Sequence, residues 1–382
     1  MALDEATRDE MLHSLRRFVS QRLRPLERQV ADEDRVPAEI IDEMRALGLF
    51  GLSVPEEYGG LGLSLEDECR VVMELGQTSP AFRSVFGTNV GIGSQGLVMF
   101  GTEVQKRTWL PKIASGQIIT SFALTEPEAG SDAAAIQTRA GRDGTEYVLN
   151  GTKRYITNAG SASLFTVMAR TEAKDRGHAG ISAFLVPRDS VGLSVGKPEK
   201  KMGQQGAQIH DVVFTNVRVP GENRLGEEGD GFKVAMRVLD KGRLHIAALS
   251  IGAAERLLKD CVAYASERRQ FGKPIASFQL VQAMIADSKT EAYAARTMTL
   301  ESARRYDLGQ KVTLEASASK YFSSEMVGRV ADRAVQIFGG AGYVADHGIE
   351  RMYRDVRVFR IYEGSSQIQQ LIIARETLEQ GG

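Results

Sequence analysis

Cysteine and metal-binding patterns are almost missing from this 382-residue sequence. The two cysteines, Cys69 and Cys261, are too few for a disulfide framework or for a cysteine zinc site. The five histidines lie far apart, and none has the spacing of a metal-binding motif. We therefore expect a protein of a reducing compartment that folds without a structural metal.

Long apolar runs and an excess of one charge are missing as well. No apolar run approaches the ~20 residues that a membrane-spanning helix needs, and the first residues contain neither an apolar signal core nor a basic transit stretch. The 48 Lys and Arg residues nearly balance the 49 Asp and Glu residues, so the net charge is -1. Such a charge provides no field that attracts nucleic acid or anionic lipid. These features predict a cytoplasmic protein that binds neither a membrane nor nucleic acid.

The composition that remains is typical of a folded chain of two or three domains, because 42% of the residues are hydrophobic and 25% are charged. Residues 1–117 are predicted to form a helical domain. Apolar residues recur there at spacings of three and four between Met11 and Leu23, which is the stripe of an amphipathic helix.

Prolines and glycines divide this helical region further. Pro80 is expected to close a segment that begins near Leu65. Residues 109–111, Trp-Leu-Pro, and residues 115–116, Ser-Gly, are expected to mark a break before the next region.

Residues 118–226 have the pattern of a small β domain. Asn150-Gly151 lies between two β-rich runs and predicts a hairpin turn. Short strands at this spacing are typical of a β-barrel or a β-sandwich. Further strands are predicted at Leu164–Ala169, Ile181–Val186 and Asp211–Phe214.

Residues 227–382 return to a helical pattern. The acidic segment 226–231 is interpreted as a turn into a helix over residues 232–268, and further helices are predicted over 278–308 and 313–338. The whole chain is therefore predicted to be an α+β protein of three domains.

Common nucleotide-binding and nucleophile motifs are missing. There is no GxxxxGK[ST] loop and no GxSxG elbow, and Gly339-Gly340-Ala341-Gly342 neither matches GxGxxG nor follows a strand. A Rossmann domain and a serine hydrolase are therefore not favoured.

Several other segments stand out, and each alone has an ordinary explanation. Thr125 and Ser131 can be turn hydroxyls, Tyr155 and Thr157 can be β-formers, and Glu363 can be an exposed acid. Their occurrence together, in one order along nearly the whole chain, is far more specific. The segments are FALTEPEAGSD at 122–132, GTKRYITN at 151–158, ERRQFGKP at 267–274, QIFGGAG at 336–342 and IYEGSSQ at 361–367.

This set resembles the acyl-CoA dehydrogenase family. The resemblance implies an N-terminal all-helical domain, a middle β-barrel domain and a C-terminal four-helix-bundle domain. It also implies FAD as the cofactor, an acyl-CoA thioester as the substrate, and electron-transfer flavoprotein as the electron acceptor. Family members remove two hydrogens across the α and β carbons, and they share FAD between subunits, which implies a homotetramer.

The resemblance assigns roles to individual residues. Glu363 matches the catalytic base. Some relatives carry the base on the long helix instead, and because that position is Gly242 in this sequence, the alternative base is missing. Substrate contacts are expected from Ser131, Arg243, Tyr362 and Gly364. The expected FAD contacts are Thr125, Ser131, Tyr155, Thr157, Arg268, Phe271, Gln336, Gly339, Gly340, Ser365 and Gln367.

Two departures from the family pattern concern the substrate. The loop at 203–210 has Ala207 and Ile209 where many relatives place Ser-x-Thr, so His210 either helps to hold CoA or is a surface histidine. Arg83 resembles a residue that pairs with the distal carboxylate in glutaryl-CoA dehydrogenases, but Gly76 stands where those enzymes have a glutamate. We therefore expect Arg83 to be structural and the acyl chain to be uncharged. A decarboxylating glutaryl-CoA-type enzyme and a flavin oxidase or monooxygenase remain the alternatives.

Overall fold

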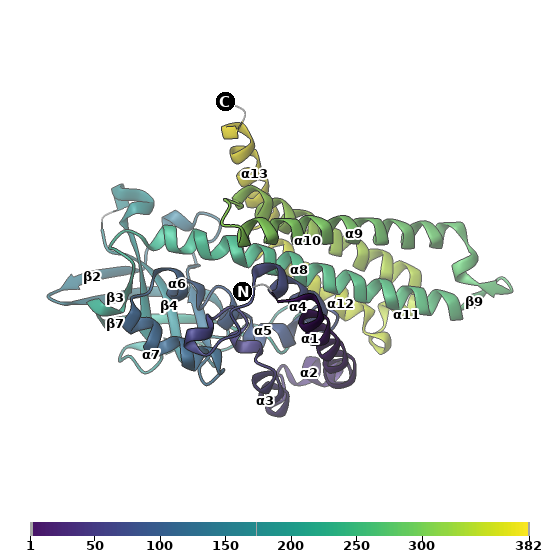
Figure 1. Cartoon of the computed structure of the whole chain (residues 1–382), viewed down its shortest axis with the longest axis horizontal. Coiled ribbons are helices and arrows are strands. Elements are labelled where there is room, and N and C mark those ends of the chain that lie inside the picture. Colours follow the sequence, from purple (N-terminus) through teal and green to yellow (C-terminus); the bar gives the residue numbers. More distant parts are fainter. Residues whose placement is uncertain (1–2, 173, 381–382) are drawn as a thin grey trace.

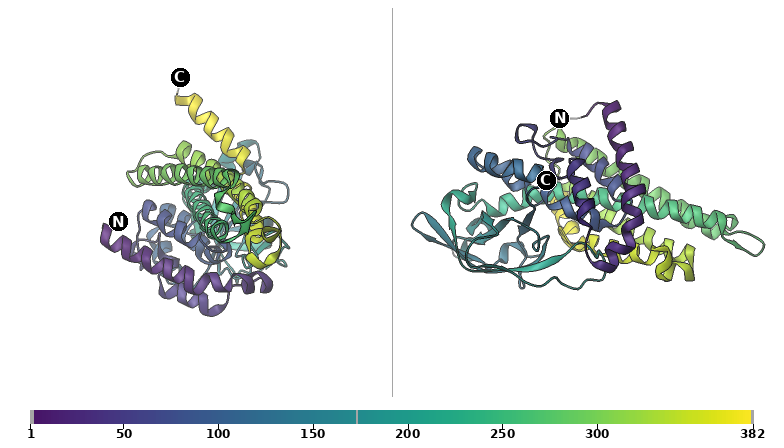
Figure 2. Two further views of the ribbon diagram at one scale, coloured as in Figure 1. Left: turned by 90° about the vertical axis from the view of Figure 1, so that its right-hand side faces the viewer. Right: turned by 90° about the horizontal axis from the view of Figure 1, so that it is seen from below.

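The computed structural model describes residues 3–172 and 174–380 of the chain. The molecule is elongated, with a β-sheet at one end and long helices that extend to the other end (Figure 1). The N-terminal helices pack against the middle of the molecule, alongside the long helices (Figure 2). The predicted α+β fold, in the order helical, β and helical, is confirmed.

The N-terminal region is built from short helices around a core that includes Phe50, Phe82 and Phe86. The first helix begins after Asp4, whose side chain accepts a hydrogen bond from the Thr7 N–H at 2.9 Å. The helices of this region are α1 (Glu5–Phe18), α2 (Glu27–Glu33), α3 (Ala38–Ala46), α4 (Leu65–Leu75), α5 (Pro80–Val90), α6 (Gln95–Phe100) and α7 (Glu103–Ala114).

Two of the predicted helix boundaries are wrong. Helix α4 ends before Gly76, and Pro80 is the first residue of α5, a position where the missing N–H of proline removes no helical hydrogen bond. Pro111 lies in the last turn of α7, which tolerates it and ends only at Ala114. The break predicted at residues 115–116 is present, because Gly116 turns the chain with a φ of 70°.

The β region is one mixed sheet of eight strands in the order β6-β7-β3-β2-β4-β5-β8, with β1 parallel to β4. In this order the path of the sheet ends at β6 and β8. The three predicted strands at 164–169, 181–186 and 211–214 lie in β4, β5 and β7. The strands are β1 (Thr120–Ala123), β2 (Arg139–Asp143), β3 (Glu146–Thr157), β4 (Leu164–Arg170), β5 (Ile181–Pro187), β6 (Leu193–Val195), β7 (Ile209–Pro220) and β8 (Arg224–Leu225).

The hairpin predicted at Asn150-Gly151 is wrong. Both residues lie inside β3, and the turn falls earlier, between Asp143 and Glu146, where β2 pairs with β3. Gly151 instead occupies an irregularity in the pairing of β3 with β7, at a place where a Cβ would overlap Thr138. The glycine thus serves a close approach of two chain segments rather than a turn.

The C-terminal region consists mainly of long helices, as the breaker-free sequence predicts. They bury a core of aliphatic residues and alanines. None of the helices in the described part of the chain is both long and apolar enough to cross a membrane. The helices are α8 (Gly231–Glu267), α9 (Gln279–Asp307), α10 (Thr313–Phe338), α11 (Gly340–Tyr343), α12 (Ile349–Val356) and α13 (Ser366–Gln380), and a hairpin of β9 (Arg269–Gln270) and β10 (Lys273–Pro274) joins α8 to α9.

Helix α8 connects the three regions. Its first turns, including Val234 and Val238, pack against residues of the sheet. Further along, Leu244 and Leu257 pack in the core of the C-terminal helices together with Cys69 of α4. The polar residues of α8 at 240–243 therefore lie at the junction of all three regions.

Candidate active site

A cavity of about 420 Å³ lies at this junction. Helix α5, helix α8, the loops around β1 and β3 and the loop before α13 all contribute to its wall. A concave, partly apolar pocket with a few polar groups is the usual form of a small-molecule site. Its larger apolar side chains are Ile92, Phe122, Leu124, Ile156, Phe232, Met236, Leu239, Ile368 and Ile372.

The loop that carries Glu363 has a strained backbone. Glu363 has a φ of 52° and Gly364 a φ of 88°, so a non-glycine residue occupies the left-handed region. Two side chains hold this loop. The Lys320 Nζ donates to the Gly364 carbonyl at 2.7 Å, and the Gln369 side chain donates to the carbonyls of Glu363 and Gly364 at 3.2 and 3.0 Å. The backbone from which the Glu363 side chain extends is therefore fixed by its surroundings.

The Glu363 carboxylate lines the cavity and has an unused acceptor. Among the described residues, its buried Oε2 atom has no hydrogen-bond partner. Space for this oxygen exists because residue 242 is a glycine, whose Cβ, if present, would overlap Glu363 Oε2. A buried carboxylate oxygen without a partner is costly unless a ligand or a reaction uses it.

Burial raises the pKa of the Glu363 carboxyl above its ordinary value, whereas Arg83, Lys320 and Arg243 act to lower it. Burial likewise lowers the pKa of Lys320 to about 8. A carboxylate with a raised pKa that faces a cavity is typical of a general base.

The wall of the same cavity also contains four of the residues predicted to contact FAD. Thr125, Ser131, Tyr155 and Thr157 all line it, as do the predicted substrate contacts Arg243, Tyr362 and Gly364. Tyr155 is 55% exposed although aromatic, and it has a φ of 59°. Hydroxyl-bearing side chains and a half-exposed aromatic ring thus line the same cavity as Glu363.

A buried ion pair supports this wall from behind. Lys153 of β3 contacts Glu126 at 2.7 Å and donates to the Leu124 carbonyl at 3.0 Å. Glu126 also accepts hydrogen bonds from the backbone N–H groups of Gln137 and Thr138. These contacts fix the segment on both sides of Thr125.

The other predicted FAD contacts do not line the cavity. Arg268 and Phe271 lie at the β9 hairpin, and Gln336, Gly339 and Gly340 lie at the end of α10 and the start of α11, all exposed. Figure 1 shows β9 and α11 toward the same end of the long helices, the end away from the sheet. Ser365 and Gln367 follow the Glu363 loop at the start of α13 without lining the cavity.

The last turn of α8 and the end of α10 are joined by a stacked pair of rings. The rings of Tyr264 and Phe338 stack with centroids 4.0 Å apart, and Arg268 donates its backbone N–H to the Tyr264 carbonyl. Gly339 directly follows Phe338. The two exposed segments that carry predicted FAD contacts are therefore neighbours in space.

The structure bears on two expectations about the substrate pocket. Arg83, which was expected to be structural, is only 8% exposed and lines the cavity. His210 is not a surface histidine, because it is 4% exposed and packs closely against Gly160. His210 lies outside the cavity wall.

Lys320 and Gln369, which hold the Glu363 loop, are functional residues that were not predicted from the sequence. A signal for Lys320 exists in the sequence, because it is a lone cation among the small buried residues of α10, such as Ala316, Ser319 and Ser323. A lysine on such a face must find a buried acceptor. Its acceptor, 44 residues further along the chain, has no local signal.

Comparisons with known proteins agree with this architecture. The chain matches the models of the acyl-CoA dehydrogenase N-terminal domain over residues 5–117, the middle domain over 121–217 and the C-terminal domain over 229–378. It is 40% identical over 368 residues to an acyl-CoA dehydrogenase of Bacillus subtilis (strain 168), which covers 96% of this chain and 97% of that protein.

Solved structures give the same result. Butyryl-CoA dehydrogenase from Megasphaera elsdenii superposes with a TM-score of 0.95 at 36% identity, over 98% of this chain and 99% of that one. A solved structure described as the electron transferring flavoprotein of Acidaminococcus fermentans contains a chain that superposes with a TM-score of 0.95 at 38% identity, over 98% of both chains.

The chain therefore belongs to the acyl-CoA dehydrogenase family, whose members are oxidoreductases that act on CH–CH groups. FAD is the cofactor of this family and hence of this chain. The cavity fits such a cofactor, because its wall combines the half-exposed ring of Tyr155 with the hydroxyl-bearing side chains of Thr125 and Thr157, which suit a flat ring system with one apolar and one polar end.

Proposed function

We propose that this protein oxidises a saturated acyl-CoA thioester to the trans-2-enoyl-CoA, with Glu363 as the catalytic base. The observation that carries the proposal is the Glu363 carboxylate, whose buried Oε2 has no partner among the described residues and which shares a cavity with four predicted FAD contacts. An α-proton next to a thioester is weakly acidic, so its removal needs a positioned base and a stabilised thioester oxygen.

The backbone N–H of Glu363 is suited to stabilise the thioester oxygen. Among the described residues, no backbone or side-chain group accepts a hydrogen bond from the Glu363 N–H. This free donor lies in a loop that Lys320 and Gln369 hold rigid. We infer that it binds the thioester oxygen as negative charge develops there, while Glu363 Oε2 takes the α-proton. Bound FAD supplies the acceptor for the hydride that leaves the β-carbon.

The apolar part of the cavity favours an uncharged acyl chain. Each methylene that enters such a pocket gains about 0.8 kcal/mol. Activity is therefore expected to rise with chain length until the cavity is full.

A single-turnover experiment tests the reaction. Stopped-flow mixing with a panel of saturated acyl-CoAs is expected to bleach the flavin absorbance, and added electron-transfer flavoprotein is expected to restore it faster than oxygen does. A site closed by product and poor in water should keep oxygen from the reduced cofactor. Absence of bleaching across the panel would contradict the reaction, and rapid peroxide formation in air would indicate an oxidase instead.

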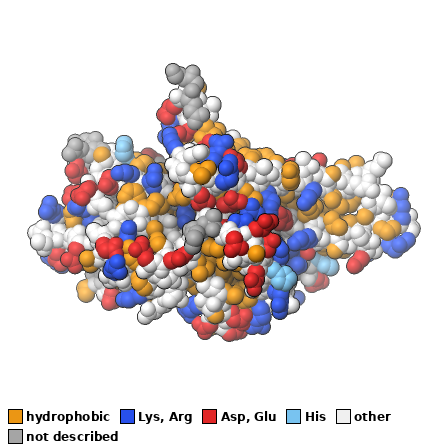
Figure 3. Space-filling model, viewed as in Figure 1, with side chains coloured by type: hydrophobic (Ala, Val, Ile, Leu, Met, Phe, Trp, Pro, Cys, Tyr) orange, Lys and Arg blue, Asp and Glu red, His pale blue; other side chains and the backbone are white. Residues whose placement is uncertain are grey.

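Electron-transfer flavoprotein as the acceptor and a homotetramer as the assembly are further parts of the proposal. Support for the assembly comes from exposed residues at the far end of the long helices, where apolar side chains reach the surface (Figure 3). Phe271 is 92% exposed, Tyr343 83% and Leu280 82%. Apolar exposure of this kind is typical of an interface. The predicted FAD contacts Arg268 and Gln336 lie in the same area and would reach FAD in a neighbouring subunit.

Removal of the Arg268 guanidinium tests this assembly. Arg268→Ala is expected to retain less FAD, measured as the ratio of flavin to protein absorbance after gel filtration, because a charged contact to the cofactor is lost. Arg142→Ala is a matched control, since Arg142 is an exposed arginine on β2 at the opposite end of the molecule (Figure 1). A wild-type protein that binds FAD as a stable monomer in light scattering would contradict the shared site.

A further inference from the structure

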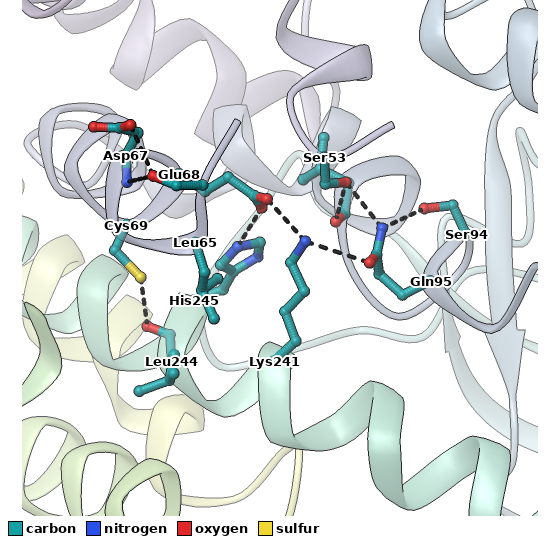
Figure 4. A network of polar contacts seen from close by, with 12 residues as sticks. Ser53, Leu65, Asp67, Glu68, Cys69, Ser94, Gln95, Lys241, Leu244 and His245 are labelled. Carbon is teal, nitrogen blue, oxygen red and sulfur yellow. Dashed lines mark hydrogen bonds and ion pairs between the residues drawn. The ribbon is translucent and has the colours of Figure 1, made fainter. Parts of the chain in front are cut away.

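A buried polar network lies next to the cavity, where α4 meets α8 (Figure 4). Glu68 of α4 is its centre. One carboxylate oxygen contacts Lys241 Nζ at 2.8 Å, and the other contacts His245 Nε2 at 2.9 Å. Lys241 also donates to the Gln95 side chain at 3.3 Å. All four side chains are buried, so each charge in the network must be balanced locally.

The network determines the form of His245. Burial lowers the pKa of His245, so the ring is neutral. Burial acts to raise the pKa of Glu68, but Lys241 and His245 together lower it, so Glu68 is ionised and can only accept. His245 must therefore donate from Nε2 to Glu68, which leaves its Nδ1 as an acceptor. Arg83 Nη2 donates to this Nδ1 at 3.4 Å.

The charges of the network leave Arg83 unbalanced. Lys241 and Glu68 neutralise each other, and His245 carries no charge. In the described part of the chain, Arg83 has no carboxylate within ion-pair distance, and its Nε has no partner. Arg83 also lines the cavity, and the carboxylate of Glu363, which lacks a partner for Oε2, lines the same cavity.

We propose that Arg83 is the counter-charge of Glu363 across the cavity, and that Glu68 and His245 position it there. The proposal rests on the function proposed above, in which Glu363 is the base. An uncharged acyl chain that enters the cavity displaces water, and this loss of hydration disfavours the ionised carboxylate. The Arg83 guanidinium, which is hydrogen-bonded to His245, stays in position when the acyl chain binds. The attraction between Arg83 and Glu363 becomes stronger as the local dielectric constant falls.

The other cations around Glu363 are held by different partners. Arg243 of α8 pairs with Asp240 at 2.6 Å, and Arg375 of α13 pairs with Glu376. Lys320 of α10 donates to the neutral Gly364 carbonyl and so holds the loop from the backbone side. Arg83 of α5 is also the strongest of the three influences that lower the pKa of Glu363. Its role is thus to keep the base ionised rather than to touch the reacting carbons.

The test measures the pH dependence of flavin reduction by an uncharged acyl-CoA at saturation. In Arg83→Met the pKa of Glu363 is expected to rise by about one pH unit. The acid limb of the pH–rate profile therefore moves to higher pH, and at pH values on that limb flavin reduction becomes about tenfold slower. Arg83→Lys, which keeps the charge, is expected to restore the wild-type limb. His245→Leu should move the limb in the same direction by less, because the guanidinium remains but is no longer held.

Arg256→Met is the matched control. Arg256 is also 8% exposed and is paired with Glu27 and Asp260. Its loss should lower the melting temperature without moving the acid limb. An unchanged limb in Arg83→Met, with selective loss of glutaryl-CoA oxidation, would overturn the proposal and make Arg83 a partner of the substrate.

A second measurement is independent of turnover. Infrared titration of the Glu363 carboxylate, with Glu363→Gln as the reference, gives its pKa in the FAD-loaded protein without substrate. The pKa should be higher in Arg83→Met than in the wild type, and equal values would refute the counter-charge. Bleaching of the wild type by acyl-CoA separately decides the proposed reaction.

Discussion

Glu363→Gln is expected to lower the rate of flavin reduction by acyl-CoA by about 10³-fold, the range typical of a lost general base. The protein should stay yellow and folded, because the amide occupies the same space beside Gly242 and keeps the backbone N–H of the loop. Stopped-flow absorbance at the flavin maximum measures the rate. Glu291→Gln is the control, since Glu291 pairs with Arg329 and Arg333 at the surface of α9, and it should leave the rate unchanged.

The same variant has an expected effect on stability. Because burial raises the pKa of Glu363 in the folded state, the folded protein binds this proton more tightly than the unfolded chain does. The wild-type free energy of unfolding therefore decreases as the pH rises above the ordinary glutamate value of 4.5. Glu363→Gln removes this penalty, so its melting temperature at pH 7 should equal or exceed that of the wild type. A clear decrease, or near-normal bleaching, would show that Glu363 has a structural role instead.

The sequence was sufficient for features that depend on periodicity or on a motif. The long helices α8, α9 and α10 follow from apolar spacing and the absence of breakers, and the IYEGSSQ segment marks the loop that carries Glu363. Local sequence signals gave the wrong prediction where pairing with a distant segment overrides the local preference. Asn150-Gly151 is a strong turn signal, but the pairing of β3 with β7, some 60 residues away, incorporates it into a strand.

The cavity itself could not be predicted in the same way. The contacts of Lys320 with Gly364 and of Arg83 with His245 join residues 44 and 162 positions apart, and no local pattern reports them. Burial is also a property of the assembled chain. Arg83 and His210 belong to residue types that are often found at surfaces, and only the packing of α5, β7 and α8 removes them from solvent.

Gly242→Ala is expected to reduce flavin reduction by about 100-fold, because a displacement of about 1 Å at a reacting group is enough for such a loss. The added methyl group would overlap Glu363 Oε2 and approach Ile92 Cγ2 at 3.2 Å. The loop cannot yield freely, since Lys320 and Gln369 hold its carbonyls, so the carboxylate itself must rotate away from the substrate.

This loss should not arise from unfolding. Alanine in a helix interior is favoured over glycine by about 1 kcal/mol, and residue 242 lies in the interior of α8, three turns from its start. Gly141→Ala is the control, since a Cβ at Gly141 meets no atom within 4 Å. FAD content should match the wild type in both variants, and neither variant should melt at a lower temperature. Wild-type bleaching by Gly242→Ala would mean that the carboxylate works from another position. If flavin reduction falls as predicted, residue 242 must be a glycine whenever residue 363 carries the base, because a side chain at 242 and the Glu363 carboxylate would occupy the same space.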